Sequence, residues 1–267
     1  EKNEDILTEI VDVVAPSIPT VPTLPTLPEG PIAGSNGDTI VDETGAINNP
    51  DGTTVIDPDG NILDKDGDIL IDKDGNILDK DGNVVVDKDG NIVNGSLDEE
   101  GNIIDNEGNI VVDKDGNIVN PDGTIVIDKD GNILDKDGNT IVDKDGNIKD
   151  KEGNIVVDKD GNQYIPGINI PKELPVTDES GNTVIDADGN ILDQEGNIVV
   201  DSNGKIVGGT VNPDGSVSDS NGNVIIDKDG NILDKDGNII VDNAGNVIDN
   251  TVKVDSFVIT SENITLL

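Results

Sequence analysis

The residues whose type and spacing could do chemistry are aspartates, which recur two positions apart in front of a glycine, as in Asp72-Lys73-Asp74-Gly75-Asn76. Oxygen ligands of this kind suit a hard cation such as calcium. If the copies stack at strand spacing, Asp72 would lie near Asp87 and Asp74 near Asp89, and a cation would relieve their repulsion. The candidate calcium ligands are Asp64, Asp66, Asp72, Asp74, Asp79, Asp81, Asp87, Asp89, Asp113, Asp115, Asp128, Asp130, Asp135, Asp137, Asp143, Asp145, Asp227, Asp229, Asp234 and Asp236.

The alternative is that these aspartates only form turns. The third turn position also accepts Glu107, Asn203 and Ala244, and alanine cannot bind a metal. The first position is almost always Asp or Asn, which is what an Asx-turn requires. Lysines between the carboxylates, such as Lys73, reduce the repulsion. Calcium binding and turn formation therefore both remain open from the sequence.

Composition argues against catalysis. The 267 residues carry a net charge of -40, with no His or Cys, one Tyr and one Phe. Carboxylates, lysines and hydroxyls are the main groups left for acid–base or nucleophilic work. A carboxylate pair could serve a glycosidase, but no Asp differs from its many copies. We expect no enzyme, no nucleic-acid partner because the charge repels phosphate, and no membrane insertion because no apolar run approaches ~20 residues.

Glycine spacing defines the repeat. From Gly37 to Gly90 the turn glycines alternate at eight and seven residues, which gives a period of 15. Two gaps of 11 residues interrupt the series, Gly90 to Gly101 and Gly204 to Gly215, and they lie 114 residues apart. The equal phasing on both sides of each gap indicates duplication of a longer block. A typical turn begins with Asp or Asn, often continues with Lys or Pro, and has Gly at its fourth position. This pattern predicts a type I turn followed by a residue in the left-handed conformation.

Between the turns lie short apolar segments of two or three residues, such as Ile62-Leu63 and Ile69-Leu70-Ile71. The first residue of the shorter segment is Ile or Val throughout, while the second can be Lys149 or Ser218. Side chains alternate along a strand, so the first should face a core and the second can face water. We predict an all-β fold, a tandem 15-residue β-solenoid of seven-plus-eight half-coils. The alternative is a long antiparallel meander of β-hairpins.

In the longer segments all three residues are apolar, so strict alternation would place an apolar row on the surface. Such a row marks association with another surface. The candidate self-association residues are Leu70, Val85, Val111, Val126, Ile141, Val156, Val199, Ile225 and Ile240.

The ends and one interruption differ from the array. Residues 1–15 carry apolar residues at helical spacing and predict an amphipathic helix. Residues 16–33 are rich in proline and predict a semi-rigid spacer. The repeats occupy residues 34–161, a proline-containing loop follows at 162–180, and the array continues over 181–250. Residues 251–267 alternate and predict a terminal strand.

The array resembles the β-solenoid and β-roll repeats of bacterial surface adhesins and biofilm matrix proteins as a class, although their Gly-Gly-x-Gly-x-Asp nonapeptide is absent. The resemblance implies a structural rod at the cell surface or outside the cell, with an unidentified surface partner. The alternatives are a self-assembling filament or bundle subunit and a calcium-dependent secreted module. Ice binding has less support, because strand threonines occur at Thr54, Thr140 and Thr183 rather than in regular rows.

Overall fold

The computed structural model describes residues 14–28, 30–34, 37–212 and 214–248, and these residues form 26 strands and no helix. The chain divides into two compact units, Glu1–Gly167 and Ile168–Leu267, each of which is described by itself. The helix predicted for residues 1–15 falls almost entirely outside the described residues. The terminal strand predicted for residues 251–267 lies outside them.

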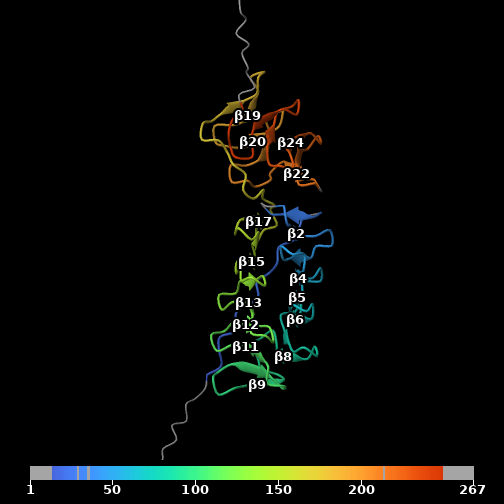
Figure 1. Ribbon diagram of the computed structural model, residues 1–267, viewed down its shortest axis with the longest axis vertical. Coiled ribbons are helices and arrows are strands. Elements are labelled where there is room, and N and C mark those ends of the chain that lie inside the picture. The colour runs from blue at the N-terminus through green and yellow to red at the C-terminus, as the bar shows by residue number, and fades with distance from the viewer. Residues whose placement is uncertain (1–13, 29, 35–36, 213, 249–267) are drawn as a thin grey trace, which may run out of the picture. The chain divides into compact units, whose positions relative to one another are not determined.

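Unit 1 holds two sheets (Figure 1). The first contains β1 (Ile32–Ala33), β2 (Thr39–Val41), β3 (Ile47–Asn48), β4 (Thr54–Ile56), β5 (Ile62–Leu63), β6 (Ile69–Ile71), β7 (Ile77–Leu78) and β8 (Val84–Val86). The second contains β9 (Gly95–Leu97), β10 (Ile103–Asp105), β11 (Ile110–Val112), β12 (Ile118–Val119), β13 (Ile125–Ile127), β14 (Ile133–Leu134), β15 (Thr140–Val142), β16 (Ile148–Lys149) and β17 (Ile155–Val157).

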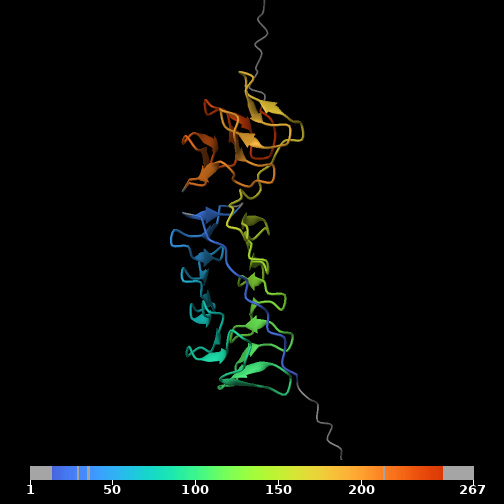
Figure 2. The same ribbon diagram turned by 180° about the vertical axis from the view of Figure 1, so that it is seen from behind.

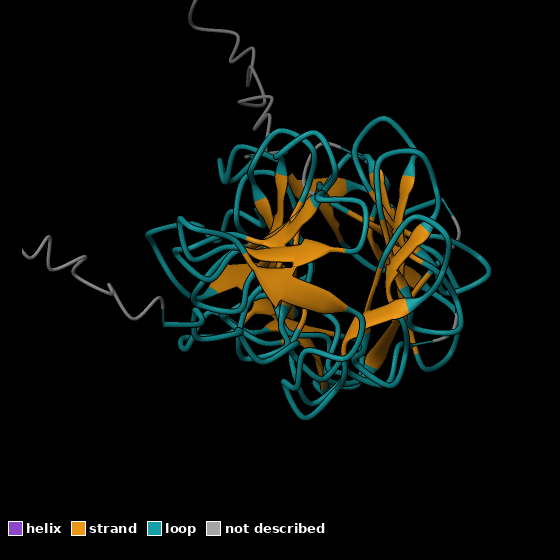
Figure 3. Cartoon of the chain, turned by 90° about the horizontal axis from the view of Figure 1, so that it is seen from below, coloured by secondary structure: helices purple, strands orange, loops and turns teal. Residues whose placement is uncertain are grey.

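Unit 2 has the same plan with fewer strands. Its first sheet contains β18 (Val176–Thr177), β19 (Thr183–Ile185), β20 (Ile191–Leu192) and β21 (Ile198–Val200). Its second contains β22 (Gly209–Val211), β23 (Val217–Asp219), β24 (Val224–Ile226), β25 (Ile232–Leu233) and β26 (Ile239–Val241). The strands lie inside and the turns form a rim around them (Figure 3).

Every strand pairs antiparallel with the next strand in its sheet, so the fold is a meander and not the solenoid that we favoured. A solenoid would stack strands 15 residues apart in parallel. The turn chemistry closes hairpins instead. In the turn after β6, the Gly75 N–H donates to the Asp72 carbonyl at 2.8 Å, and the Asp72 N–H donates to the Asn76 carbonyl at 3.0 Å. Gly75 has a φ of +89°, which confirms the predicted turn.

A β-bulge in the longer apolar strands, such as β6, overturns the predicted apolar surface row. Ile62 pairs with Ile71 and Leu63 with Ile69, which leaves Leu70 without a partner opposite. Strict alternation breaks at such an extra residue. Leu70 (6% exposed) and Ile71 (0%) therefore both face the core, while Ile69 (39%) faces outward. The same holds for the other eight residues of the predicted row, all of which are buried: Val85, Val111, Val126, Ile141, Val156, Val199, Ile225 and Ile240.

Some shorter strands follow the predicted alternation: Ile133 and Ile148 are buried, while Leu134 and Lys149 behind them are half-buried. In others the second residue is buried as well, as at Val119 and at Ser218, which we expected to be able to face water. One face of each sheet is thereby apolar, and in unit 1 the two sheets share a single core that runs from Ile32 to Val157.

The 11-residue gaps are the places where the chain leaves one sheet and starts the other. Gly95 opens the second sheet of unit 1, and a Cβ there would lie 2.8 Å from Val85 Cγ1 and 2.5 Å from the Ile104 carbonyl oxygen. Gly209, 114 residues later, lies 2.7 Å by the same measure from Val199 Cγ1 in unit 2. The duplicated break is thus the same reversal in both units, and glycine is required at each.

The proline-rich segment, predicted as a semi-rigid spacer, is extended and packs on unit 1. We call residues 16–28 the strap, because they run along the second sheet of unit 1 (Figure 2, dark blue). Ile18, Val21, Leu24 and Leu27 pack against the core, while the Ser and Thr residues before them are exposed. The sequence repeats Pro, Ser or Thr, and an aliphatic residue with the three-residue period of a polyproline II helix, so one side stays apolar.

Part of the interruption at 162–180 has a comparable place in unit 2. A Cβ on Gly189 would lie 3.5 Å from Ile170 and 3.6 Å from Leu174. The Asn169 side chain donates to the Asn243 carbonyl at 2.8 Å. Residues 169–174 therefore pack on the turns of unit 2 rather than forming only a loop.

The bulge makes a matched test possible in β26, where Ile239 (38% exposed) and Ile240 (3%) are adjacent residues of one type. Ile240→Ala should lower the free energy of unfolding of unit 2 by about 2–4 kcal/mol through the cavity it leaves, and Ile239→Ala by less than about 1 kcal/mol. Urea denaturation of the two variants measures both values. Equal losses would contradict the bulged register.

Candidate functional site

Alternate turns of a meander lie on opposite edges of the sheet. Turns that follow the bulged three-residue strands of the second sheet of unit 1, such as the one at Gly131, contact the strap. We call this side, and the corresponding side of the other sheets, the strap edge. Turns that follow two-residue strands, such as the one at Gly138, lie on the other side. There, lysine–carboxylate pairs join the two sheets of unit 1, and we call this side the ion-pair edge.

The first aspartate of each turn is held by its own turn. Asp128 Oδ1 accepts the N–H of Asp130 at 3.0 Å and of Asn132 at 2.9 Å, and Oδ2 accepts the Asn132 side-chain amide at 2.8 Å. Burial acts to raise the pKa of Asp128, but the hydrogen bonds from Asn132 outweigh it and hold the pKa below its usual value. The charged carboxylate therefore adds stability at neutral pH, and this contribution is lost as the pH falls through that lowered pKa.

Asparagine at the fifth turn position links successive turns along the strap edge. The Asn132 amide donates to Asp128 of its own turn, while its Oδ1 accepts the backbone N–H of Lys144 in the next turn at 2.9 Å. The same 12-residue link joins Asn61 to Lys73, Asn76 to Lys88, Asn102 to Lys114, Asn117 to Lys129, Asn147 to Lys159, Asn190 to Ser202 and Asn231 to Asn243. This asparagine ladder ties successive turns together through hydrogen bonds of the chain itself.

The predicted calcium ligands fall into two groups. The ten first-position residues all accept hydrogen bonds within their own turns: Asp64, Asp72, Asp79, Asp87, Asp113, Asp128, Asp135, Asp143, Asp227 and Asp234. The ten third-position residues are exposed, and six of them pair with the preceding lysine: Asp66, Asp89, Asp137, Asp145, Asp229 and Asp236. Asp74, Asp81, Asp115 and Asp130 complete this group.

Among the described residues, one group of three carboxylates comes within metal-binding distance, and it includes none of the predicted ligands. Oxygens of Asp193, Glu195 and Asp219 lie within 4.8 Å of one another on facing turns of unit 2. Asp193 and Asp219 are buried and accept amide hydrogen bonds from Asn197 and Asn223, while Glu195 is exposed.

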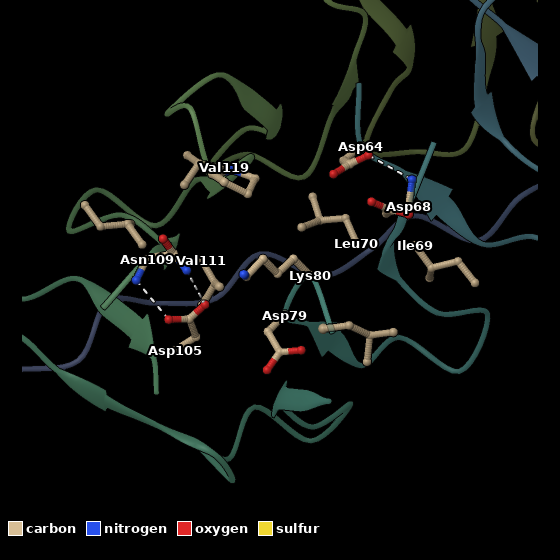
Figure 4. Close-up of a pocket in the computed structure, with 13 residues that line it drawn as sticks. Asp64, Asp68, Ile69, Leu70, Asp79, Lys80, Asp105, Asn109, Val111 and Val119 are labelled. Carbon is tan, nitrogen blue, oxygen red and sulfur yellow. Dashed lines mark hydrogen bonds between the residues drawn. The ribbon is translucent and has the colours of Figure 1, made fainter. Parts of the chain in front are cut away.

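The corresponding place in unit 1 carries a lysine. Counting back 114 residues, Gln194 corresponds to Lys80 and Asn221 to Glu107. The Lys80 Nζ lies 3.0 Å from Glu107 of the facing turn. Figure 4 shows the Lys80 side chain extending past Leu70 toward the Asp105 side of a shallow pocket between the two sheets. The carboxylates of unit 2 lack this neutralising partner.

Three further ion pairs join the two sheets of unit 1 along the ion-pair edge. Lys136 lies 3.4 Å from Asp51, Lys151 lies 3.2 Å from Asp38, and Lys65 lies 4.0 Å from Asp122. Each pair is partly exposed, so its free energy is small. Their combined effect is to favour one alignment of the facing turns.

A second type of turn was not recognised from the sequence. Where the first residue is Asn, the fifth is Thr or Ser. The Asn120 amide donates to Thr124 Oγ1 at 2.7 Å, and Thr124 Oγ1 donates to Asp122 at 2.7 Å. Asn49 with Thr53 and Asn212 with Ser216 repeat this arrangement. The pairing of first and fifth residue types is visible in the sequence and could have identified both networks.

No family model, curated protein or solved structure matches the chain. The residues that the structure describes include no helix long and apolar enough to cross a membrane.

The two turn types predict a favourable coupling between two substitutions. Asp128→Asn should lower the free energy of unfolding by about 1–2 kcal/mol, because two amide groups then face each other. Adding Asn132→Thr also breaks the bond from the Lys144 N–H, but it should cost less stability in this background than it does alone, since Asp130 is already present to accept the threonine hydroxyl. Asp130→Asn alone serves as the control and should change stability little. A double variant that is less stable than the sum of the single variants would contradict the network.

Lys80 in unit 1 and Gln194 at the corresponding position of unit 2 differ in charge beside similar carboxylates. Exchanging each for the other residue type should change the stability of the two units in opposite directions. Lys80→Gln should lower the melting temperature and Gln194→Lys should raise it, each by roughly 1–3 °C at low salt. Thermal melts followed by circular dichroism in 10 mM and 500 mM NaCl (conditions of roughly 30 Å and 4 Å screening length) should show both effects shrinking with salt. A salt-independent change would point to packing instead.

Proposed function

We propose that the chain is a structural, non-catalytic repeat module of an extracellular or cell-surface protein, a stalk or matrix component. The observation that carries the proposal is that the first-position carboxylates serve the fold itself. Each accepts N–H groups of its own turn, and the strap-edge turns are joined by the asparagine ladder. The aspartates and asparagines of the turns, which are the most frequent polar residues of the repeat, thus hold the fold together.

The regularity of these networks also supports a role without catalysis. A catalytic acid or base needs surroundings that set its pKa apart from those of similar groups. Here Asp57, Asp105 and Asp234 accept hydrogen bonds from the same turn positions as Asp128. Burial acts to raise the pKa of each, but the hydrogen bonds from its fifth-position asparagine help to lower it below its usual value. A scaffold benefits from this uniformity because each repeat presents the same surface.

The net charge of -40 is consistent with a module whose surface is exposed to solvent. Exposed third-position acids such as Asp74 and Asp115 give the turns a negative outer rim. Net charge of this size keeps chains soluble and apart from one another. The resemblance to adhesin and matrix repeats points in the same direction.

A self-assembling filament subunit is the second candidate, favoured by an apolar row on the outer faces of the sheets. It differs from the row expected from the sequence and consists of the first residues of longer strands, which are 37–40% exposed: Ile69, Ile110, Ile125, Ile198, Val224 and Ile239. Stacked outer faces would cover these side chains. Fibres that form with increasing concentration would favour this role.

A calcium-dependent module is the third candidate, and the carboxylates of Asp193, Glu195 and Asp219 favour it. In this role calcium would take the place that Lys80 has in unit 1. The other turns would still fold through their own hydrogen bonds.

Thermal melts in excess EDTA and in millimolar calcium separate these roles. We expect the same far-UV circular dichroism spectrum and melting temperature in both, because the turn carboxylates already have donors. A melting temperature raised by calcium would contradict the metal-free scaffold. If the rise disappears in Glu195→Gln but persists in the matched Glu100→Gln variant, the calcium module takes its place.

A further inference from the structure

The strap and the turns of the second sheet of unit 1 share one spacing. The carbonyl oxygens of Ser17, Thr20, Thr23 and Thr26 lie 2.5, 3.0, 2.5 and 2.6 Å from where a Cβ would be on Gly116, Gly131, Gly146 and Gly161. Three residues of a polyproline II helix advance ~9.3 Å, and two strand spacings cover ~9.6 Å. Each tripeptide of the strap therefore meets one turn glycine.

These glycines do more than permit the turn. Gly138 and Gly146 have φ values of +86° and +90°, so both need a residue that tolerates the left-handed region. A Cβ on Gly138, at the ion-pair edge, would have nothing within 4 Å, whereas one on Gly146 would collide with the Thr23 carbonyl. Gly116, Gly131, Gly146 and Gly161 thus form the wall of a groove that contacts the strap backbone directly, and a side chain at any of them would block this contact.

The strap is held mainly by side-chain packing. Among the described residues, no backbone hydrogen bond joins it to either sheet. Its aliphatic side chains instead pack on the core, and Pro22 and Pro25 are buried. A proline-rich segment of this kind is already extended before it binds, which keeps the entropic cost of docking low.

Charge indicates which partner this groove fits. Residues 14–28 contain no charged side chain, in a chain of net charge -40. An uncharged segment can approach the acidic turns of another molecule without the repulsion that other parts of the chain would meet. The four tripeptides of the strap also match the four groove glycines in number and spacing.

We propose that this groove accepts the strap of a second copy in place of its own, so that exchanged straps link chains. The exchanged and unexchanged states have the same contacts, which is the condition for domain swapping at low energetic cost. Linking depends on concentration because the chain's own strap competes from within the molecule. This inference does not depend on the structural role proposed above.

A labelled peptide of residues 14–28 tests the groove. The probe is titrated by fluorescence anisotropy against the full chain and against the full-length Val21→Asp/Leu24→Asp variant, whose own strap is weakened. We expect binding to the variant at least tenfold tighter than to the unaltered chain, and no binding of a peptide with the same two Asp substitutions. Within the variant, Gly146→Ala should weaken binding at least tenfold, whereas the matched Gly138→Ala should not.

Sedimentation velocity tests the link between whole chains. The unaltered protein should form dimers as its concentration rises, excess peptide should dissociate them, and Val21→Asp/Leu24→Asp should remain monomeric. A variant that keeps its β-sheet circular dichroism yet fails to bind the peptide would overturn the proposal. So would dimers that persist in excess peptide, or an unaltered chain that stays monomeric. If the variant does not fold, failure of the unaltered chain to capture the peptide after prolonged incubation overturns the proposal.

Discussion

The fold depends on one local interaction, the acceptance of backbone N–H groups by an aspartate carboxylate within its own turn. The turn backbone would otherwise leave donors pointing into the loop, and the carboxylate satisfies two of them, as Asp128 does for Asp130 and Asn132. Each of these networks closes within five residues, so the sequence of a turn itself supplies the groups that hold it. Short strands of two or three residues can then pair with their neighbours in sequence, although each carries little pairing energy by itself.

The turn networks also explain how a chain with two aromatic residues in 267 builds a core. The bulge places two adjacent residues of each longer strand, such as Val85 and Val86, on the inner face. Each two-strand repeat therefore contributes three apolar side chains to the core, two of them adjacent in the sequence. Small β-branched residues suit this arrangement because facing sheets and a strap enclose them from three directions.

Much of the local structure could be predicted from the sequence, and the long-range structure could not. The Asx residues and glycines specify the type I turn with its left-handed glycine, and the apolar pattern specifies short strands. Both are properties of five to eight neighbouring residues. The choice between coil and hairpin depends on whether strands pair in parallel or antiparallel, which a uniform 15-residue period does not specify. The assumption of strict alternation placed Leu70 on the surface, but a bulge turns this side chain toward the core. The residue types in the strand do not reveal the bulge.

In the candidate site, too, the local contacts could be predicted from the sequence and the long-range contacts could not. Turn formation by aspartate was one of two readings of the sequence, and the structure gives Asp72 and its equivalents partners within their own turns. The acidic place at Asp193 and Asp219 could not be foreseen, because it joins turns from two sheets whose facing depends on the chain reversal near Gly209. The packing of the strap could not be predicted, because its three-residue pattern has a structural meaning only beside glycines that recur every 15 residues.

The shared spacing of strap and sheet makes the length of a unit a discrete quantity. In the part of the chain that the structure describes, unit 1 has sheets of eight and nine strands and unit 2 has sheets of four and five, so both sheets shorten by the same four strands. A single added repeat in one sheet would leave turns without a facing turn and a groove without a strap. Growth by gene duplication must therefore add 15 residues to each sheet and, where a strap is present, one tripeptide to it. Change in length is then a coordinated event at three separated positions, which leaves the chain few intermediate sizes.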